Sequence, residues 1–128
     1  MKYFDTRGKL VLFSLALYLL YFYMPYIYEN IYDTEVLNSL FSSPVEPVIA
    51  LSGTVSWMLL VLHCIAAILL FFRLLYAKYF YLCMVSLSVI LASLGGTVTY
   101  SGFDVLILAL LNMSDGVIIY LSFFHIDK

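Results

Sequence analysis

Charged side chains are scarce in this sequence: Asp, Glu, Lys and Arg together make up 11% of its 128 residues. Soluble domains usually carry about 25% charged residues, which cover the surface with groups that water solvates. A chain that is 65% hydrophobic, with a mean hydropathy of +1.05, cannot cover itself in this way. Lipid must therefore be part of its solvent, and a water-soluble globular domain is excluded.

Basic residues and cysteines are also few, which argues against nucleic-acid binding and against a cysteine-based metal or redox site. Six Lys and Arg scattered along a chain of net charge −2 do not form the basic face that binding to nucleic acid requires. The two cysteines, Cys64 and Cys83, form no Cys-x-x-C pair and lie in apolar stretches, so we interpret them as buried hydrophobic residues. No ligand set stands at metal-binding spacing, and we expect neither a metal nor a cofactor.

Four long apolar stretches account for most of the chain. They cover residues of about 10–28, 48–72, 79–96 and 104–124, and a helix needs about 20 residues to cross a bilayer. The first stretch follows a basic start but leads into bulky residues instead of a cleavage site, so we interpret it as a retained helix ending near Pro25. The sequence thus predicts a single all-α domain, an integral membrane four-helix bundle with short loops.

The distribution of basic residues predicts the direction of the spans. With four spans, all six Lys and Arg fall on one side of the membrane, which the positive-inside rule makes cytoplasmic. We therefore expect both termini in the cytoplasm and the chain in a bacterial inner (plasma) membrane.

The opposite side carries the longest connection, residues 29–47. Within it, Asp33 is expected to cap a short helix over Thr34–Phe41. The connection either forms an outward recognition surface for a basic partner or is a solvated loop that follows the topology rule. The acidic residues expected to form this surface are Glu29, Asp33, Glu35 and Glu46.

Two ionisable residues lie deep inside the predicted spans, where charges are costly. His63 precedes Arg73 by ten residues and Asp115 precedes His125 by ten, so each lies roughly 15 Å from the cytoplasmic boundary. Their two helices run in the same direction, and the side chains are therefore level and able to meet. We predict a polar centre in the bundle made of His63, Asp115, Asn112 and Ser88.

Small and hydroxylated residues indicate which helix faces avoid lipid. The third span has small residues at every fourth position, a spacing typical of close helix packing. One face of the first span is lined by Ser14, Tyr18 and Tyr21. The residues expected at helix–helix contacts are Ser88, Ala92, Gly96 and Gly116.

Two interpretations of the polar centre stay open. In the first, its residues hydrogen-bond to one another and hold the helices in register. In the second, Asp115 is a functional carboxylate for protons or cations, and His63 modulates its charge. The loops are too short to build a catalytic site, and no nucleophile–base pair or metal triad stands at the membrane surface, so we do not expect an enzyme.

An interaction protein fits these features with the fewest assumptions. It would act through helix–helix and outer-loop contacts, as an accessory subunit of a membrane complex or as an immunity protein against a membrane-acting toxin. Its partners would be the lipid bilayer and either another membrane protein or further copies of the chain. The alternative is an oligomeric ion or proton channel, or a small transporter, that uses Asp115.

Overall fold

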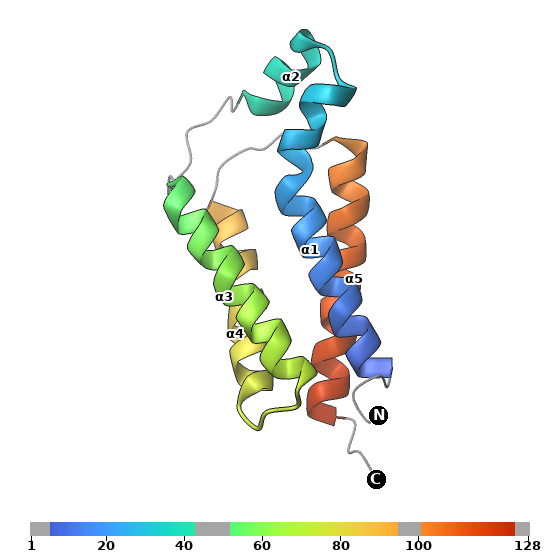
Figure 1. Cartoon of the computed structure of the whole chain (residues 1–128), viewed down its shortest axis with the longest axis vertical. Helices are drawn as coiled ribbons and strands as arrows, with labels where there is room; N and C mark the ends of the chain where they lie inside the picture. Colours follow the sequence, from blue (N-terminus) through green and yellow to red (C-terminus); the bar gives the residue numbers. More distant parts are fainter. Residues whose placement is uncertain (1–5, 43–51, 95–100, 125–128) are drawn as a thin grey trace.

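The computed structural model of the chain describes residues 6–42, 52–94 and 101–124. It contains four long helices, α1 (Thr6–Ile31), α3 (Gly53–Phe71), α4 (Ala77–Leu94) and α5 (Gly102–Phe124), and a short helix α2 (Thr34–Phe41) (Figure 1). Each of the four long helices is long and apolar enough to cross a membrane. The predictions of an all-helical chain and of four such helices are confirmed.

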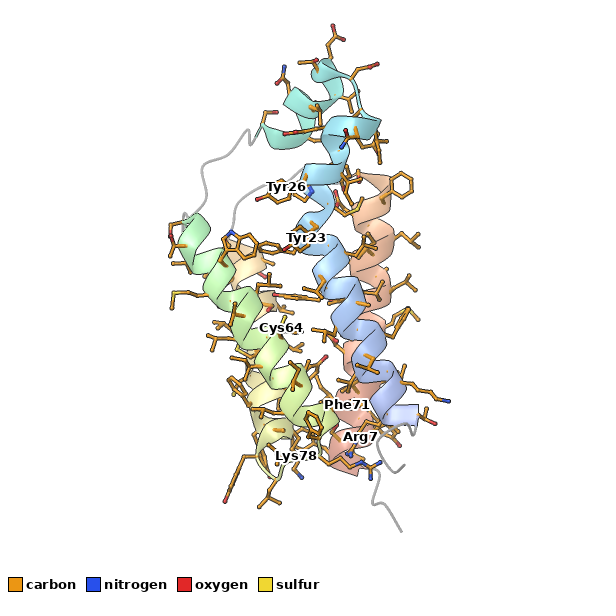
Figure 2. The ribbon with its side chains drawn as sticks, in the orientation of Figure 1. Arg7, Tyr23, Tyr26, Cys64, Phe71 and Lys78 are labelled. Carbon is orange, nitrogen blue, oxygen red and sulfur yellow. The ribbon has the colours of Figure 1, made fainter. Side chains whose placement is uncertain are left out.

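The four long helices form a bundle in which each helix packs against two neighbours. α1 packs against α5 and α3, and α4 packs against the same two helices, so α1 and α4 face each other across the interior. Neighbouring helices run in opposite directions (Figure 1). One end of the bundle, here called the basic end, carries Arg7, Arg73 and Lys78; Figure 2 shows Arg7 and Lys78 there. The opposite end, here called the acidic end, carries α2.

The interior of the bundle holds two apolar clusters, and its exterior is apolar as well. The cluster nearer the basic end includes Val11, Leu70, Tyr81 and Ile118. Large apolar side chains also point outwards from all four long helices, and Met113 of α5 is 70% exposed. A surface of this kind is costly in water and suits the acyl chains of a bilayer. The outward-facing apolar residues therefore agree with the membrane-spanning length of the helices.

α1 continues through Pro25 and ends at Ile31, so the prediction that it ends near Pro25 is wrong. A proline inside a helix removes a hydrogen bond and costs about 3 kcal/mol. Contacts on both sides of the proline offset this cost, because Met24 before it and Tyr28 after it are buried in the apolar cluster that α1 shares with α5. The Tyr28 hydroxyl also lies 2.7 Å from the Ser101 hydroxyl.

α2 occupies the predicted range, Thr34–Phe41, and packs beside the end of α1. Asp33 stands at its N-cap position, but its side chain makes no capping hydrogen bond. The helix is held instead by Leu37 and Leu40, which pack against the apolar cluster at the acidic end. Burial of an apolar face, more than capping, therefore stabilises this short helix.

Candidate functional site

The side chain of Asp115 lies in the interior of the bundle, where hydroxyl groups from two other helices reach it. The Ser14 hydroxyl of α1 donates a hydrogen bond of 2.5 Å to Oδ1 of Asp115, and the Tyr81 hydroxyl of α4 donates one of 2.7 Å to the same oxygen. The oxygens of Ser14 and Tyr81 are 3.2 Å apart. All three side chains are at most 3% exposed. We call these three residues the carboxylate cluster; it joins α1, α4 and α5.

His63 of α3 is buried next to the carboxylate cluster but does not hydrogen-bond to it. Its ring stacks on Tyr18 with 3.9 Å between the centroids and lies 5.6 Å from the Tyr81 ring. Neither ring nitrogen has a hydrogen-bond partner among the described residues. His63 and Asp115 thus share the interior, as the depth argument predicts, with Tyr81 between them.

Ser88 and Tyr18 lie on the acidic-end side of this centre. Ser88 is half-buried and donates a hydrogen bond of 2.9 Å to the carbonyl oxygen of Met84 in its own helix. Ser88 therefore makes no hydrogen bond to Asp115 among the described residues and does not belong to the carboxylate cluster.

Asn112 does not belong to the polar centre, and here the structure corrects the sequence prediction. Its side chain is exposed on the outside of α5. The buried face of α5 runs through Ile107, Leu111, Asp115 and Ile118. At 100° per residue, position 112 falls well away from that face. A spacing of three residues leaves about 60° between two side chains on a helix. The spacing between Asn112 and Asp115 therefore does not ensure that both side chains face the interior.

The small residues expected at helix–helix contacts are also placed differently. Ala92 is exposed although it lies close to the buried face of α4 at 100° per residue, because the buried residues of this helix, Ala77, Tyr81 and Met84, all lie in its first half. Gly116 is exposed, and a Cβ atom added to it would meet no atom of the described residues within 4 Å outside its immediate stretch of helix. Gly96 lies outside the described residues. Of the three that the structure describes, only Ser88 is partly buried.

A second polar cluster, which the sequence did not reveal, links α1 to the start of α5. The backbone N–H and the hydroxyl of Ser101 each donate a hydrogen bond of 3.0 Å to Oδ2 of Asp104. In return, the Asp104 N–H donates to the Ser101 hydroxyl oxygen at 3.1 Å. This reciprocal pair is a capping box with Asp in the place of Glu. The Ser101 hydroxyl also contacts Tyr28, so the cap of α5 is tied to the end of α1.

The acidic residues predicted to form an outer recognition surface lie at the acidic end. Glu29, Asp33 and Glu35 are exposed there, and Glu46 lies outside the described residues. Of the two cysteines, Cys64 is half-buried, whereas Cys83 is exposed on α4, so our interpretation of Cys83 as a buried residue is wrong.

The most important residue that sequence reasoning missed is Tyr81. It stands only four residues after the start of α4, which suggests a place near the membrane boundary. Asp115, by contrast, precedes the end of α5 by nine residues, or about 13 Å. The contact between Tyr81 and Asp115 shows that the first residue of α4 lies farther from the basic end than the last residue of α5 does. No signal in the sequence reports this offset between the two helices.

Comparison of the chain with protein-family models, with curated proteins and with solved structures finds no match. Its function must therefore be argued from the geometry described above.

Proposed function

We propose that this chain is a membrane-embedded interaction protein, not an enzyme, that presents the outer face of α5 to a transmembrane helix of another membrane protein. The observation that carries the proposal is the position of Asn112. It lies near the middle of α5, ten residues, or about 15 Å, from the helix start, and its side chain is exposed. Among the described residues its amide has no hydrogen-bond partner, and an unpaired amide in hydrocarbon costs several kcal/mol.

The residues beside Asn112 suit a closely packed partner helix. Gly102, Ala109 and Gly116 are all exposed and recur every seven residues, directly opposite the buried face of α5. A seven-residue repeat keeps one stripe facing a partner in a left-handed helix pair, and small residues let the backbones approach. Gly116 lies inside the helix, where glycine costs about 1 kcal/mol relative to alanine. No neighbour among the residues that the structure describes requires a glycine there.

The acidic end supports a partner that differs from this chain. Glu29, Asp33 and Glu35 are exposed together at that end, and like charges on a second copy would repel them. A partner with basic residues outside the membrane would be attracted to the same surface. An accessory subunit of a membrane complex and an immunity protein against a membrane-acting toxin both use contacts of this kind.

We also infer the orientation of the chain. The basic end lies in the cytoplasm of a bacterial cell and the acidic end faces outwards, because Lys and Arg are retained on the cytoplasmic side of the inner membrane. Both termini are then cytoplasmic.

Site-specific photo-crosslinking in the membranes of the native host tests the proposal. A photoreactive residue at Met113, which lies beside the row of small residues, is expected to form an adduct with a distinct membrane protein. The matched control is the same residue at Val61, which is 53% exposed on the outside of α3. We expect no adduct from Val61, because that side chain faces lipid.

Two substitutions sharpen this experiment. Asn112→Leu removes the amide, and Gly116→Leu fills the row from an exposed position where an added Cβ atom would have open space among the described residues. Each is expected to reduce the Met113 adduct at least tenfold while the protein stays folded. An adduct of twice the mass of the chain would show pairing of identical copies, and equal adducts from both positions would contradict a specific face.

A second candidate function is proton or cation transfer through the polar centre. The observation that favours it is His63, a buried imidazole that lies beside a buried carboxylate while both of its nitrogens lack partners among the described residues. If this function is correct, the protein in liposomes will conduct protons or cations, and Asp115→Asn will abolish the flux. Flux that is indistinguishable from that of empty liposomes would remove this candidate.

A further inference from the structure

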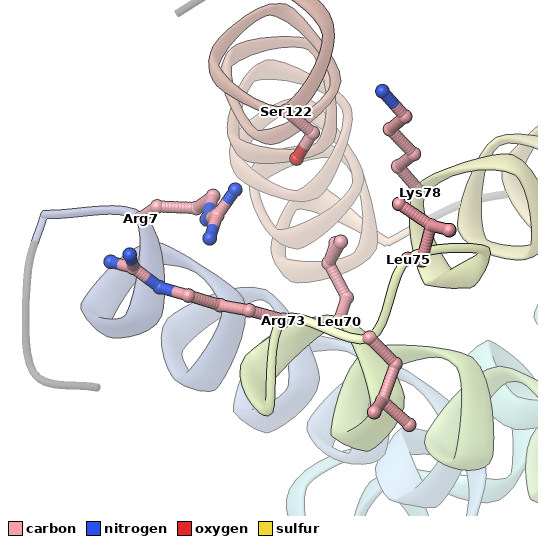
Figure 3. A pocket seen from close by; sticks show the side chains of 7 residues that line it. Arg7, Leu70, Arg73, Leu75, Lys78 and Ser122 are labelled. Carbon is pink, nitrogen blue, oxygen red and sulfur yellow. The ribbon is translucent and has the colours of Figure 1, made fainter. Parts of the chain in front are cut away.

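At the basic end, the ends of all four long helices surround one pocket of about 270 Å³ (Figure 3). Arg7 comes from the first turn of α1, Lys78 from the first turn of α4, and Arg73 from the connection between α3 and α4. Apolar side chains and one hydroxyl complete the wall: Leu70, Leu74, Leu75 and Ser122. None of the described residues that line the pocket is acidic. We call it the basic pocket.

Several features show that the basic pocket suits an anion. The guanidinium groups of Arg7 and Arg73 lie on the same side of it, and the Ser122 hydroxyl points towards its middle (Figure 3). The Ser122 oxygen is buried and has no hydrogen-bond partner among the described residues. Two helices begin and two end here, so their dipoles roughly cancel and the positive charge comes from the side chains.

The backbone at Arg73 shows how the site can be tested without disturbing the fold. Arg73 has a φ of 58°, a left-handed conformation at the end of α3 where glycine is the usual residue. Its N–H donates to the Leu70 carbonyl oxygen at 3.0 Å, and the N–H of Leu74 donates to that of Leu69 at 3.2 Å. An arginine in this conformation is less favourable than glycine. A glycine at position 73 would therefore keep this turn, so the side chain can be removed without changing the backbone.

The apolar part of the wall indicates where the anion comes from. Leu70 is buried, whereas Leu74 and Leu75 are 53% and 74% exposed at the rim. Lys78 extends along the other side, with its ammonium group 5.1 Å from the centre of the Phe123 ring. Cations beside exposed leucines, at the end of a bundle of membrane length, match a phosphate that is attached to acyl chains. The volume lies slightly below the range of about 300–1,000 Å³ for pockets that enclose whole ligands, so it suits a headgroup.

We propose that the basic pocket binds a phosphate group, supplied by the headgroup of an anionic phospholipid. Arg7 and Arg73 pair with the phosphate oxygens, Lys78 adds a third charge and the Ser122 hydroxyl donates a hydrogen bond. The leucines at the rim contact the first part of the acyl chains. This site is separate from the outer face of α5 and does not depend on it.

Native mass spectrometry of the full chain in detergent tests the site, with phosphatidylglycerol, phosphatidylcholine and inorganic phosphate as separate probes. We expect phosphatidylglycerol to stay bound in preference to phosphatidylcholine. Arg73→Gly and Lys78→Gln are each expected to weaken its binding about fivefold, the effect of removing one basic charge near a membrane surface. Arg73→Gly suits the left-handed backbone, so the fold is retained. Lys78→Gln tests the same site without changing that turn.

The matched control is Lys9→Gln, which removes the same charge from an exposed position of α1 that does not line the basic pocket. Its effect on phosphatidylglycerol binding should be less than twofold. If inorganic phosphate binds and displaces the lipid, the phosphate site stands and its source is free phosphate. Equal retention of the two lipids, or a loss with Lys9→Gln as large as with Lys78→Gln, overturns the proposal.

Discussion

The carboxylate of Asp115 is held in an apolar interior by hydroxyl groups of the same chain. Ser14 and Tyr81 both donate to Oδ1, and they come from helices that face each other across the bundle. Interhelical hydrogen bonds of this kind contribute about 0.6 kcal/mol on average and about 1.7 kcal/mol at most. Removing one donor therefore weakens the bundle measurably but should not unfold it.

Tyr81→Phe removes one donor to Asp115 and keeps the ring that lies beside His63. We expect this substitution to lower the free energy of unfolding by about 0.5–1.5 kcal/mol. Ser14→Ala should have an effect of similar size, and the double variant should differ from the sum of the two, because both hydroxyls donate to one oxygen. Reversible unfolding in mixed micelles measures all three values. Strict additivity would contradict a shared acceptor.

At the scale of the helix, α5 is hydrogen-bonded to other helices at its start as well as in its middle. Ser101 and Asp104 cap its first turn, and Ser101 contacts Tyr28 beyond the proline of α1. One hydroxyl thus serves a helix cap and a contact between helices. The Tyr28–Ser101 contact adds to the apolar burial that offsets the cost of Pro25 in α1.

Ser101→Ala removes both functions of that hydroxyl. We expect a loss of about 1–2 kcal/mol in the free energy of unfolding, the upper part of the range for a lost N-cap, because the Tyr28 contact is lost too. Ser52→Ala is the matched control. It removes the N-cap of α3, where the side chain accepts from the Val55 N–H at 3.4 Å and makes no other hydrogen bond to a described residue. Its cost should be below about 1 kcal/mol. Equal costs for the two variants would show that the contact with Tyr28 contributes nothing.

At the scale of the whole molecule, charge separates along the axis of the bundle. The basic end carries Arg7, Arg73 and Lys78, and the acidic end carries Glu29, Asp33 and Glu35. A bundle with this polarity inserts in one direction, because moving basic residues across the membrane is disfavoured.

Cysteine labelling in intact bacterial cells tests this orientation. In a background with Cys64 and Cys83 replaced by alanine, Glu35→Cys at the acidic end should react with a membrane-impermeant maleimide. Tyr76→Cys, at a position that is 76% exposed near the basic end, should react only after the cells are permeabilised. Reaction of Tyr76→Cys in intact cells would reverse the proposed orientation.

Hydropathy and charge along the chain were enough to predict an all-helical chain with four long apolar helices. Counting residues from the basic end of each helix was enough to predict that His63 and Asp115 lie at the same depth in the interior. These features depend on the local sequence, since a helix in lipid must satisfy its own backbone hydrogen bonds. The contacts of Asp115 depend instead on the position of α4 along the axis of the bundle and on the rotation of each helix about its own axis. In a membrane protein, lipid-facing and protein-facing residues are both apolar, so the sequence carries little information on rotation. Only the packed bundle therefore decided that Tyr81 meets Asp115, and that Asn112 points outwards.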